Sequence, residues 1–197
     1  MEKKKYKEKY SKKVNKKKII NKKLIDFKWI ISITLSAFLI SIVFTSLSEI
    51  VISNVGTVIS MILLLLVILI GVIFDMIGIS VTVADINTFN SMASKRVKGA
   101  SLAVKFIKNA EKLSSFCNDV IGDICGIISG ALSSSISIIL ASKFGFNLFI
   151  TTLFITGIVA ALTIGGKALG KSFAINKSNI ILFNFSKIVS FVLVLKK

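Results

Sequence analysis

The side chains best suited to chemistry in this chain are two aspartates four residues apart. Asp119 and Asp123 lie in residues 114–135, an apolar run that also carries glycine or serine at every fourth position from 122 to 134. Because residues four apart share one face of a helix, the acids and the small residues should lie side by side. A carboxylate facing hydrocarbon costs roughly 3 kcal/mol or more, so both acids need partners. Two interpretations stay open: a glycine-packed helix whose acids are neutralised by lysines, or a cation site.

The composition places these acids in a membrane. The chain has 197 residues, of which 54% are hydrophobic, and its mean hydropathy is +0.85. These values are typical of an all-α integral membrane protein with a single membrane domain.

The net charge of +17 is concentrated at the amino terminus, where 13 of the 26 basic residues lie in the first 28 positions. Residues 1–28 are therefore expected to form a disordered, lysine-rich cytoplasmic arm. Two roles stay open for it: a solvated tail that fixes the topology, or a segment that contacts anionic lipid headgroups. We expect no nucleic-acid partner, because the arm lacks the aromatic or Arg-Gly pattern of RNA-binding segments.

About four transmembrane helices follow from the apolar segments. Their expected bounds are 29–48, 55–79, 116–141 and 146–166. Residues 29–54 would form an additional N-terminal transmembrane helix with its external loop, and 55–197 the main membrane domain. The basic residues then predict a multi-pass protein of the cell membrane with both termini cytoplasmic and Ser48 to Asn54 outside.

Two further segments read as amphipathic juxtamembrane helices. Within residues 80–113, four lysines share one helical face and apolar residues lie largely opposite, as in a helix lying flat on a membrane. The lysines are Lys98, Lys105, Lys108 and Lys112. Residues 172–197 carry a polar stripe of Lys177, Asn184 and Lys187, so an interfacial or steeply tilted helix is favoured over a clean fifth span.

This topology brings distant polar residues to one depth, in the cytoplasmic half of the membrane. Asp75 ends the second span, Asp119 and Asp123 begin the third, and Lys167 follows the fourth. Three polar side chains border the same level, namely Ser80, Thr82 and Asn118. Carboxylates, hydroxyls and an amide are the hard oxygen ligands that Mg²⁺ requires. Lys167 favours a different interpretation, because its ammonium could occupy the place of the ion. Asp75 and Lys167 would then form an intramembrane ion pair.

Catalysis finds little support in the sequence, and we expect no enzyme. The chain has no histidine and no glycine-rich phosphate loop, and its serines occur without a base. Cys117 and Cys125 are eight residues apart on one helix, about 12 Å of rise, which is too far for a disulfide. We therefore expect buried, reduced thiols.

Three stretches carry a family resemblance. They read GISVTVA from Gly78, CNDVIGD from Cys117 and GKALGK from Gly166. In order and spacing they resemble the transmembrane domain of the CNNM and CorB/CorC family. The resemblance covers residues 55 to 195 and implies transport of Mg²⁺ or Co²⁺ and a homodimer. The family's paired CBS domains have no counterpart in residues 1–197, so the chain would be a divergent member.

Departures from the family pattern fall on the polar positions. Val81 and Lys167 stand where the family has glutamates, and Gly170 stands where it has proline. The sequence therefore predicts a membrane protein involved in Mg²⁺ or Co²⁺ transport or homeostasis. The alternative is a non-transporting membrane scaffold or regulator in which Lys167 replaces the ion.

Overall fold

The structure is a computed structural model that describes residues 27–54 and 56–195. It divides into two compact units, Met1–Ser36 and Ala37–Lys197, and the packing reported below is that of the second. The predicted disordered arm lies almost wholly outside the described residues. Its last two positions, Phe27 and Lys28, begin helix α2, which spans Phe27–Asn54.

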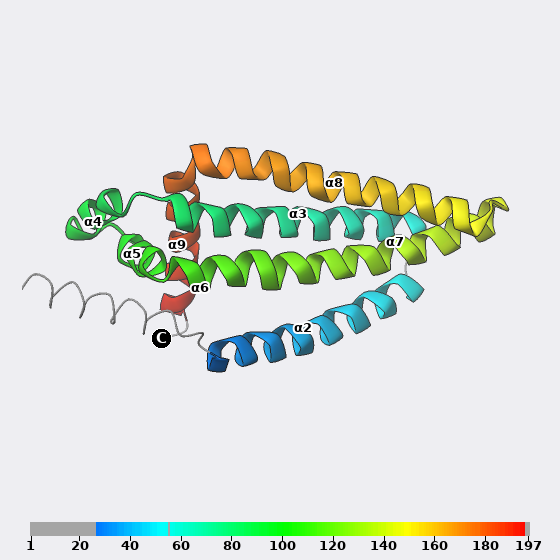
Figure 1. Cartoon of the computed structure of the whole chain (residues 1–197), viewed down its shortest axis with the longest axis horizontal. Coiled ribbons are helices and arrows are strands. Elements are labelled where there is room, and N and C mark those ends of the chain that lie inside the picture. Colours follow the sequence, from blue (N-terminus) through cyan, green and yellow to red (C-terminus); the bar gives the residue numbers. More distant parts are fainter. Residues whose placement is uncertain (1–26, 55, 196–197) are drawn as a thin grey trace, which may run out of the picture. The chain divides into compact units, whose positions relative to one another are not determined.

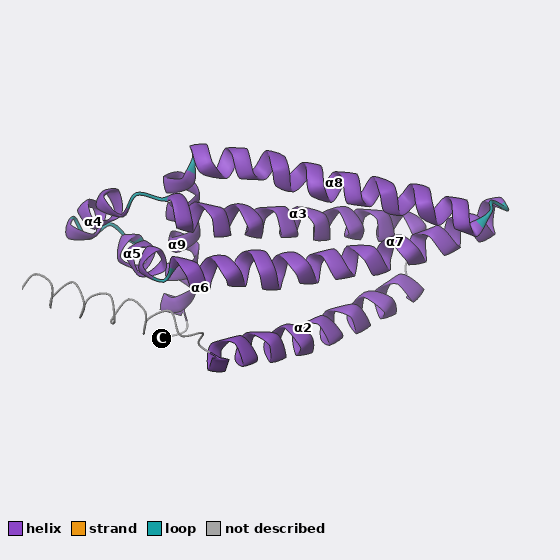
Figure 2. Cartoon of the chain, viewed as in Figure 1, coloured by secondary structure: helices purple, strands orange, loops and turns teal. Residues whose placement is uncertain are grey.

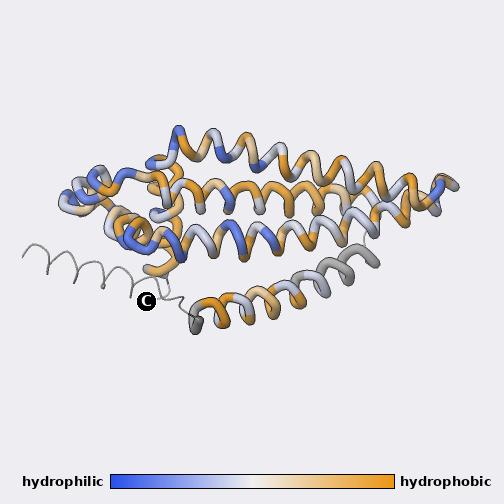
Figure 3. Tube along the Cα trace, viewed as in Figure 1, coloured by the Kyte–Doolittle hydropathy of each residue, from blue (hydrophilic) through white to orange (hydrophobic). Residues whose placement is uncertain are grey.

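Every regular element in the described residues is helical (Figure 2), as the sequence predicted. Three long helices pack pairwise against one another and run side by side (Figure 1). They are α3 (Thr57–Val83), α7 (Gly122–Phe144) and α8 (Leu148–Asn176). Hydrophobic residues run along α3, and hydrophilic ones gather around the end of the bundle next to α4 (Figure 3).

Three helices in the described part of the chain are long and apolar enough to cross a membrane. They span Thr57–Val83, Ala110–Phe144 and Leu148–Asn176. Large apolar side chains cover their outer surfaces, with Phe154 70% and Ile164 69% exposed, as expected where the solvent is lipid. In α2 the apolar stretch is the shorter Ile30–Val43. The span predicted at residues 29–48, and with it a total of four spans, therefore remains a prediction.

Glycines of α3 and α8 allow the long helices to approach closely. A β-carbon on Gly71 would lie 3.1 Å from the Cys125 Cβ of α7. On α8, a β-carbon on Gly170 would lie 2.9 Å from the Met76 Cγ of α3. Small residues at such crossings give van der Waals packing in place of the hydrophobic effect, which is weak between helices in lipid.

Most of the expected packing seam of α7 faces away from this bundle, although its first glycine, Gly122, is buried. Gly126 and Gly130 are exposed, with no atom of the described residues within 4 Å of an added β-carbon. The buried face instead carries bulky apolar residues and three serines, namely Ile124, Ile128, Leu132, Ile136, Ser129, Ser133 and Ser137. Each serine hydroxyl donates to a carbonyl of its own helix, so burial leaves no donor unpaired. Bulky residues occupy this face because they fill the space between the helices, which glycine cannot do.

A second layer of helices lies at the end of the bundle where α3 ends (Figure 1). It contains α4 (Ile86–Ser94), α5 (Ala100–Lys108), α6 (Ala110–Ser115) and α9 (Ser178–Leu195). Its core includes Val81, Phe89, Ala103 and Leu182, each with no exposed surface. The lysine face of α5 is exposed as predicted, but its apolar face packs on this protein core rather than on lipid.

The last two helices differ in part from the expected bounds. Helix α8 continues past residue 166 to Asn176, because nothing in GKALGK breaks it and Gly170 still packs on α3. Helix α9 then crosses the ends of the long helices (Figure 1). It is too short to count among the membrane-crossing helices, which agrees with the interfacial interpretation of residues 172–197.

Candidate functional site

A π-helical turn interrupts the helix that contains the two candidate acids. This turn, η1, covers Phe116–Ile121 and joins α6 to α7 without a loop. The N–H of Gly122 donates to the carbonyl of Cys117, five residues back, instead of four. Such turns are rare and occur frequently at functional sites. Asn118 and Asp119 both lie within it.

The amide of Asn118 packs directly on Gly78 of α3. A β-carbon on Gly78 would overlap the Asn118 Oδ1 atom, so only glycine leaves room for this side chain. The Nδ2 group donates weakly to the Ser114 hydroxyl at 3.4 Å. Oδ1 is buried and accepts no hydrogen bond. An unpaired buried carbonyl oxygen is unusual because it loses the hydrogen bonds it would make to water.

The two hydroxyl candidates lie on α3 just beyond Gly78. Ser80 is fully buried and Thr82 is exposed. Their hydroxyls donate to carbonyls of their own helix, Ser80 to Met76 and Thr82 to Ile79, each at 2.7 Å. Both oxygens keep lone pairs that can accept or coordinate.

The two acids face away from this interior. Asp119 and Asp123 are both exposed, on the same outward side of the helix as Gly126 and Gly130. Among the described residues, no three His, Cys, Asp or Glu side chains gather closely enough to hold a metal ion. The five predicted metal residues thus separate into an inner pair, Ser80 and Asn118, and an outer set of Thr82 and the two acids.

Lys167 reaches α7 from the neighbouring helix α8. Its Nζ lies 3.5 Å from the position that a β-carbon of Gly122 would take. Gly122 is about one turn, ~5.4 Å of rise, beyond Asn118, so the half-buried ammonium lies about one turn along the helix from the residue with the unpaired amide oxygen. The described residues show no ion pair between Lys167 and Asp75, Asp119 or Asp123. The predicted intramembrane pair stays a prediction.

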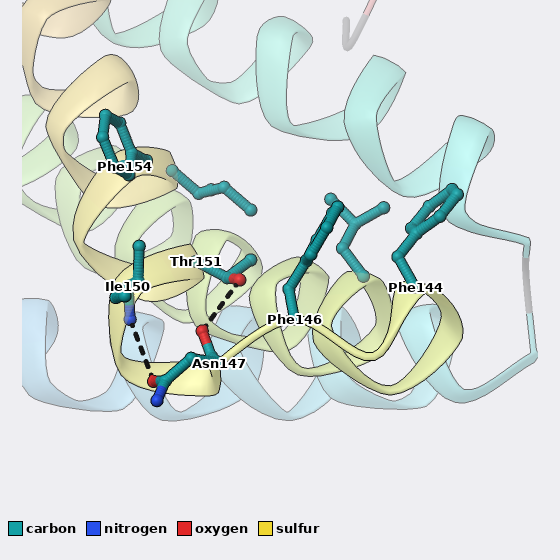
Figure 4. Close-up of a pocket in the computed structure, with 8 residues that line it drawn as sticks. Phe144, Phe146, Asn147, Ile150, Thr151 and Phe154 are labelled. Atoms are coloured by element: carbon teal, nitrogen blue, oxygen red, sulfur yellow. Dashed lines mark hydrogen bonds between the residues drawn. The ribbon is translucent and has the colours of Figure 1, made fainter.

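The opposite end of the bundle holds an apolar cavity whose lining offers few groups for catalysis or ion binding (Figure 4). It measures about 440 Å³ and lies at the hairpin between α7 and α8, lined by Phe144, Phe146 and Phe154 among others. Its two polar side chains are already engaged (Figure 4): Asn147 Oδ1 accepts from the Ile150 N–H, and the Thr151 hydroxyl donates to the Asn147 carbonyl.

Both cysteines are buried free thiols, as predicted. The sequence pattern named Asn118 as a candidate ligand but did not reveal the π turn or the contact with Gly78. The only signal was the family motif at CNDVIGD, since a π turn has the composition of the helix around it. Comparison of the chain with protein-family models, curated proteins and solved structures found no match.

Proposed function

We propose that this chain is an integral membrane protein that binds a hard divalent cation such as Mg²⁺ beside Asn118 and serves in Mg²⁺ or Co²⁺ transport or homeostasis. The observation that carries the proposal is the buried, unpaired Oδ1 atom of Asn118 in a π-helical turn. A side-chain amide oxygen is a ligand for such ions, which often retain several waters. A bound cation would restore the electrostatic partner that this oxygen lacks.

The ligand set would be completed in stages. Ser80 adds a buried hydroxyl oxygen two residues after Gly78. Asp119 and Asp123 face outward together with Gly126 and Gly130, a surface on which a second copy could approach to backbone contact. We therefore propose a homodimer in which the second copy packs on this face and covers the two acids. The proposed topology has four spans with both termini cytoplasmic.

A scaffold or regulatory role is the alternative, and the position of Lys167 favours it. The ammonium already supplies one positive charge against α7 at this level. In that case the charge of Lys167 replaces the ion and no flux occurs.

Thermal unfolding of the purified full chain with and without Mg²⁺ tests ion binding. An ion bound only by the folded state raises the melting temperature, by an amount equivalent to about 2.7 kcal/mol at 100 times its Kd. The rise should be saturable and lost in Asn118→Ala. Asn184→Ala is the matched control, because it removes an exposed amide on α9.

Mg²⁺ flux into proteoliposomes then separates the two functions. A transporter carries flux that falls in Asn118→Ala. An unaltered protein that shows neither a thermal response to Mg²⁺ nor flux would contradict the cation proposal and leave the scaffold.

A further inference from the structure

We propose that the loop at residues 95–99 and the adjoining middle of α9 form a binding site for the headgroup of an anionic phospholipid. The loop connects α4 to α5 and reads Lys-Arg-Val-Lys-Gly. The site is separate from the cation site proposed at Asn118 and does not depend on it.

The loop has a fixed and partly strained backbone. Arg96 adopts a left-handed conformation at φ 57°, which side-chain-bearing residues rarely do, and Gly99 does so at φ 88°. The Val97 N–H donates to the Met92 carbonyl at 3.1 Å, and the Arg96 N–H to the Ala93 carbonyl at 3.0 Å. Strain retained in an ordered loop is characteristic of functional sites.

Gly99 holds this loop against α9. A β-carbon on Gly99 would lie 3.0 Å from both the Cα and the N of Lys187. Only a glycine permits this approach, which brings the loop and Lys187 together although they are far apart in sequence. Ser186, the residue before Lys187, is fully buried in the same contact region.

The joined surface is strongly basic. Its exposed cations are Lys95, Arg96, Lys98 and Lys187. Residues 80–113 as a whole hold six basic residues against the acids Asp85 and Glu111. Arg96 is the only arginine of the chain, and a guanidinium forms the paired hydrogen bonds that phosphate accepts.

The apolar neighbours of Lys187 favour a lipid over a free phosphate. On the same exposed side of α9, Ile188 is 64% and Phe191 is 66% exposed. Helix α9 crosses the ends of the long helices (Figure 1). In the proposed topology this is the level of the membrane interface, where acyl chains begin. A phospholipid offers both the phosphate for the cations and the tails for Ile188 and Phe191.

Native mass spectrometry of the full chain in detergent tests the site with dioctanoyl phosphatidylglycerol, dioctanoyl phosphatidylcholine and inorganic phosphate as probes. The test variant is Arg96→Gln/Lys98→Gln/Lys187→Gln. The matched control is Lys3→Gln/Lys4→Gln/Lys5→Gln, which removes equal charge from the amino-terminal arm. Phosphatidylglycerol should bind saturably to the unaltered protein. Its affinity should fall on the order of 100-fold in the test variant and clearly less in the control, because the arm lysines attract anionic lipid without forming this site.

Several outcomes would overturn the proposal. Equal binding of phosphatidylcholine would show that charge is not recognised, and equal competition by inorganic phosphate would show a free-anion site. An equal loss in the control variant would place the lipid on the arm. Melting temperatures without lipid verify that the test variant folds, and the single variant Lys98→Gln, which should bind more weakly by about fivefold, replaces it if it does not.

Discussion

The ammonium of Lys167 lies over Gly122, with Nζ 3.5 Å from the place of a β-carbon on that glycine, and it contacts neither Asp119 nor Asp123 as an ion pair. Lys167→Met keeps the length of the side chain and removes the charge. Since no buried pair is broken, we expect the free energy of unfolding to change by less than about 1 kcal/mol. Chemical denaturation in detergent measures it.

A loss of ~3 to 5 kcal/mol in Lys167→Met would instead show that the lysine neutralises a buried acid. Lys167→Glu, which restores the residue of the resembling family, should destabilise the protein without Mg²⁺, because it puts an unpaired carboxylate at a half-buried position beside Gly122. Added Mg²⁺ should reverse that loss.

Gly78 should tolerate no side chain. Gly78→Ala would drive its β-carbon into the Asn118 amide, and such overpacking costs roughly 1 to 3 kcal/mol. Gly157→Ala on α8 is the control, since its β-carbon meets open space and alanine favours helix by up to about 1 kcal/mol. Melting temperatures compare the two. If Asn118→Ala failed to relieve any of the cost of Gly78→Ala, the clash would not be its cause.

Cysteine labelling checks the proposed topology. The native thiols Cys117 and Cys125 are buried, so an introduced surface cysteine should dominate the reaction with a membrane-impermeant maleimide. We expect Lys143→Cys, in the hairpin between α7 and α8, to react from outside intact cells. Lys95→Cys should react only after the cells are opened. The reverse pattern would invert the topology.

Helix α4 should weaken in acid through its N-cap. Hydrogen bonds from the Thr88 hydroxyl and from the N–H groups of Asn87 and Thr88 lower the pKa of Asp85 below its ordinary 3.8. The stabilisation that the ionised Asp85 cap gives to the folded state is therefore fully present above the unfolded pKa. It is lost as the pH falls through the lower pKa of the folded state. Melting temperatures between about pH 5 and 2 should fall more steeply than in Asp85→Asn, which keeps the cap without titrating. Parallel curves would contradict this role.

The sequence predicted the helices well because apolar length and period determine them locally. Which face of α7 points inward was harder to predict, since the glycine-bearing face and the opposite, bulky face are both compatible with helix packing. The glycine spacing pointed to Gly126 and Gly130, whereas Ile128 and Leu132 occupy the interior. That choice depends on the shapes of α3 and α8, which no single segment contains.

The candidate site was predictable only in part. The pattern indicated that Asn118, Ser80 and Lys167 share one level, and in the structure the Lys167 ammonium of α8 lies beside Gly122, which is about one turn beyond Asn118 in the chain. It did not indicate that Asp119 faces outward, because an α-helical count cannot include the extra residue of a π turn. The break at Asn109 between α5 and α6 was missed for a related reason, since asparagine is only weakly unfavourable in helices.

The π turn at Phe116–Ile121 holds one residue more than the same stretch of α-helix would. One residue corresponds to about 100° of rotation in an α-helix. If the turn relaxed to α-helical geometry, the segment on one side would rotate by that step relative to the other. Neighbouring residues would then exchange places, so that Asp119 could take the position against Gly78 that Asn118 now holds. A neutral amide and a carboxylate would thus alternate at one point of the bundle without any helix leaving its neighbours.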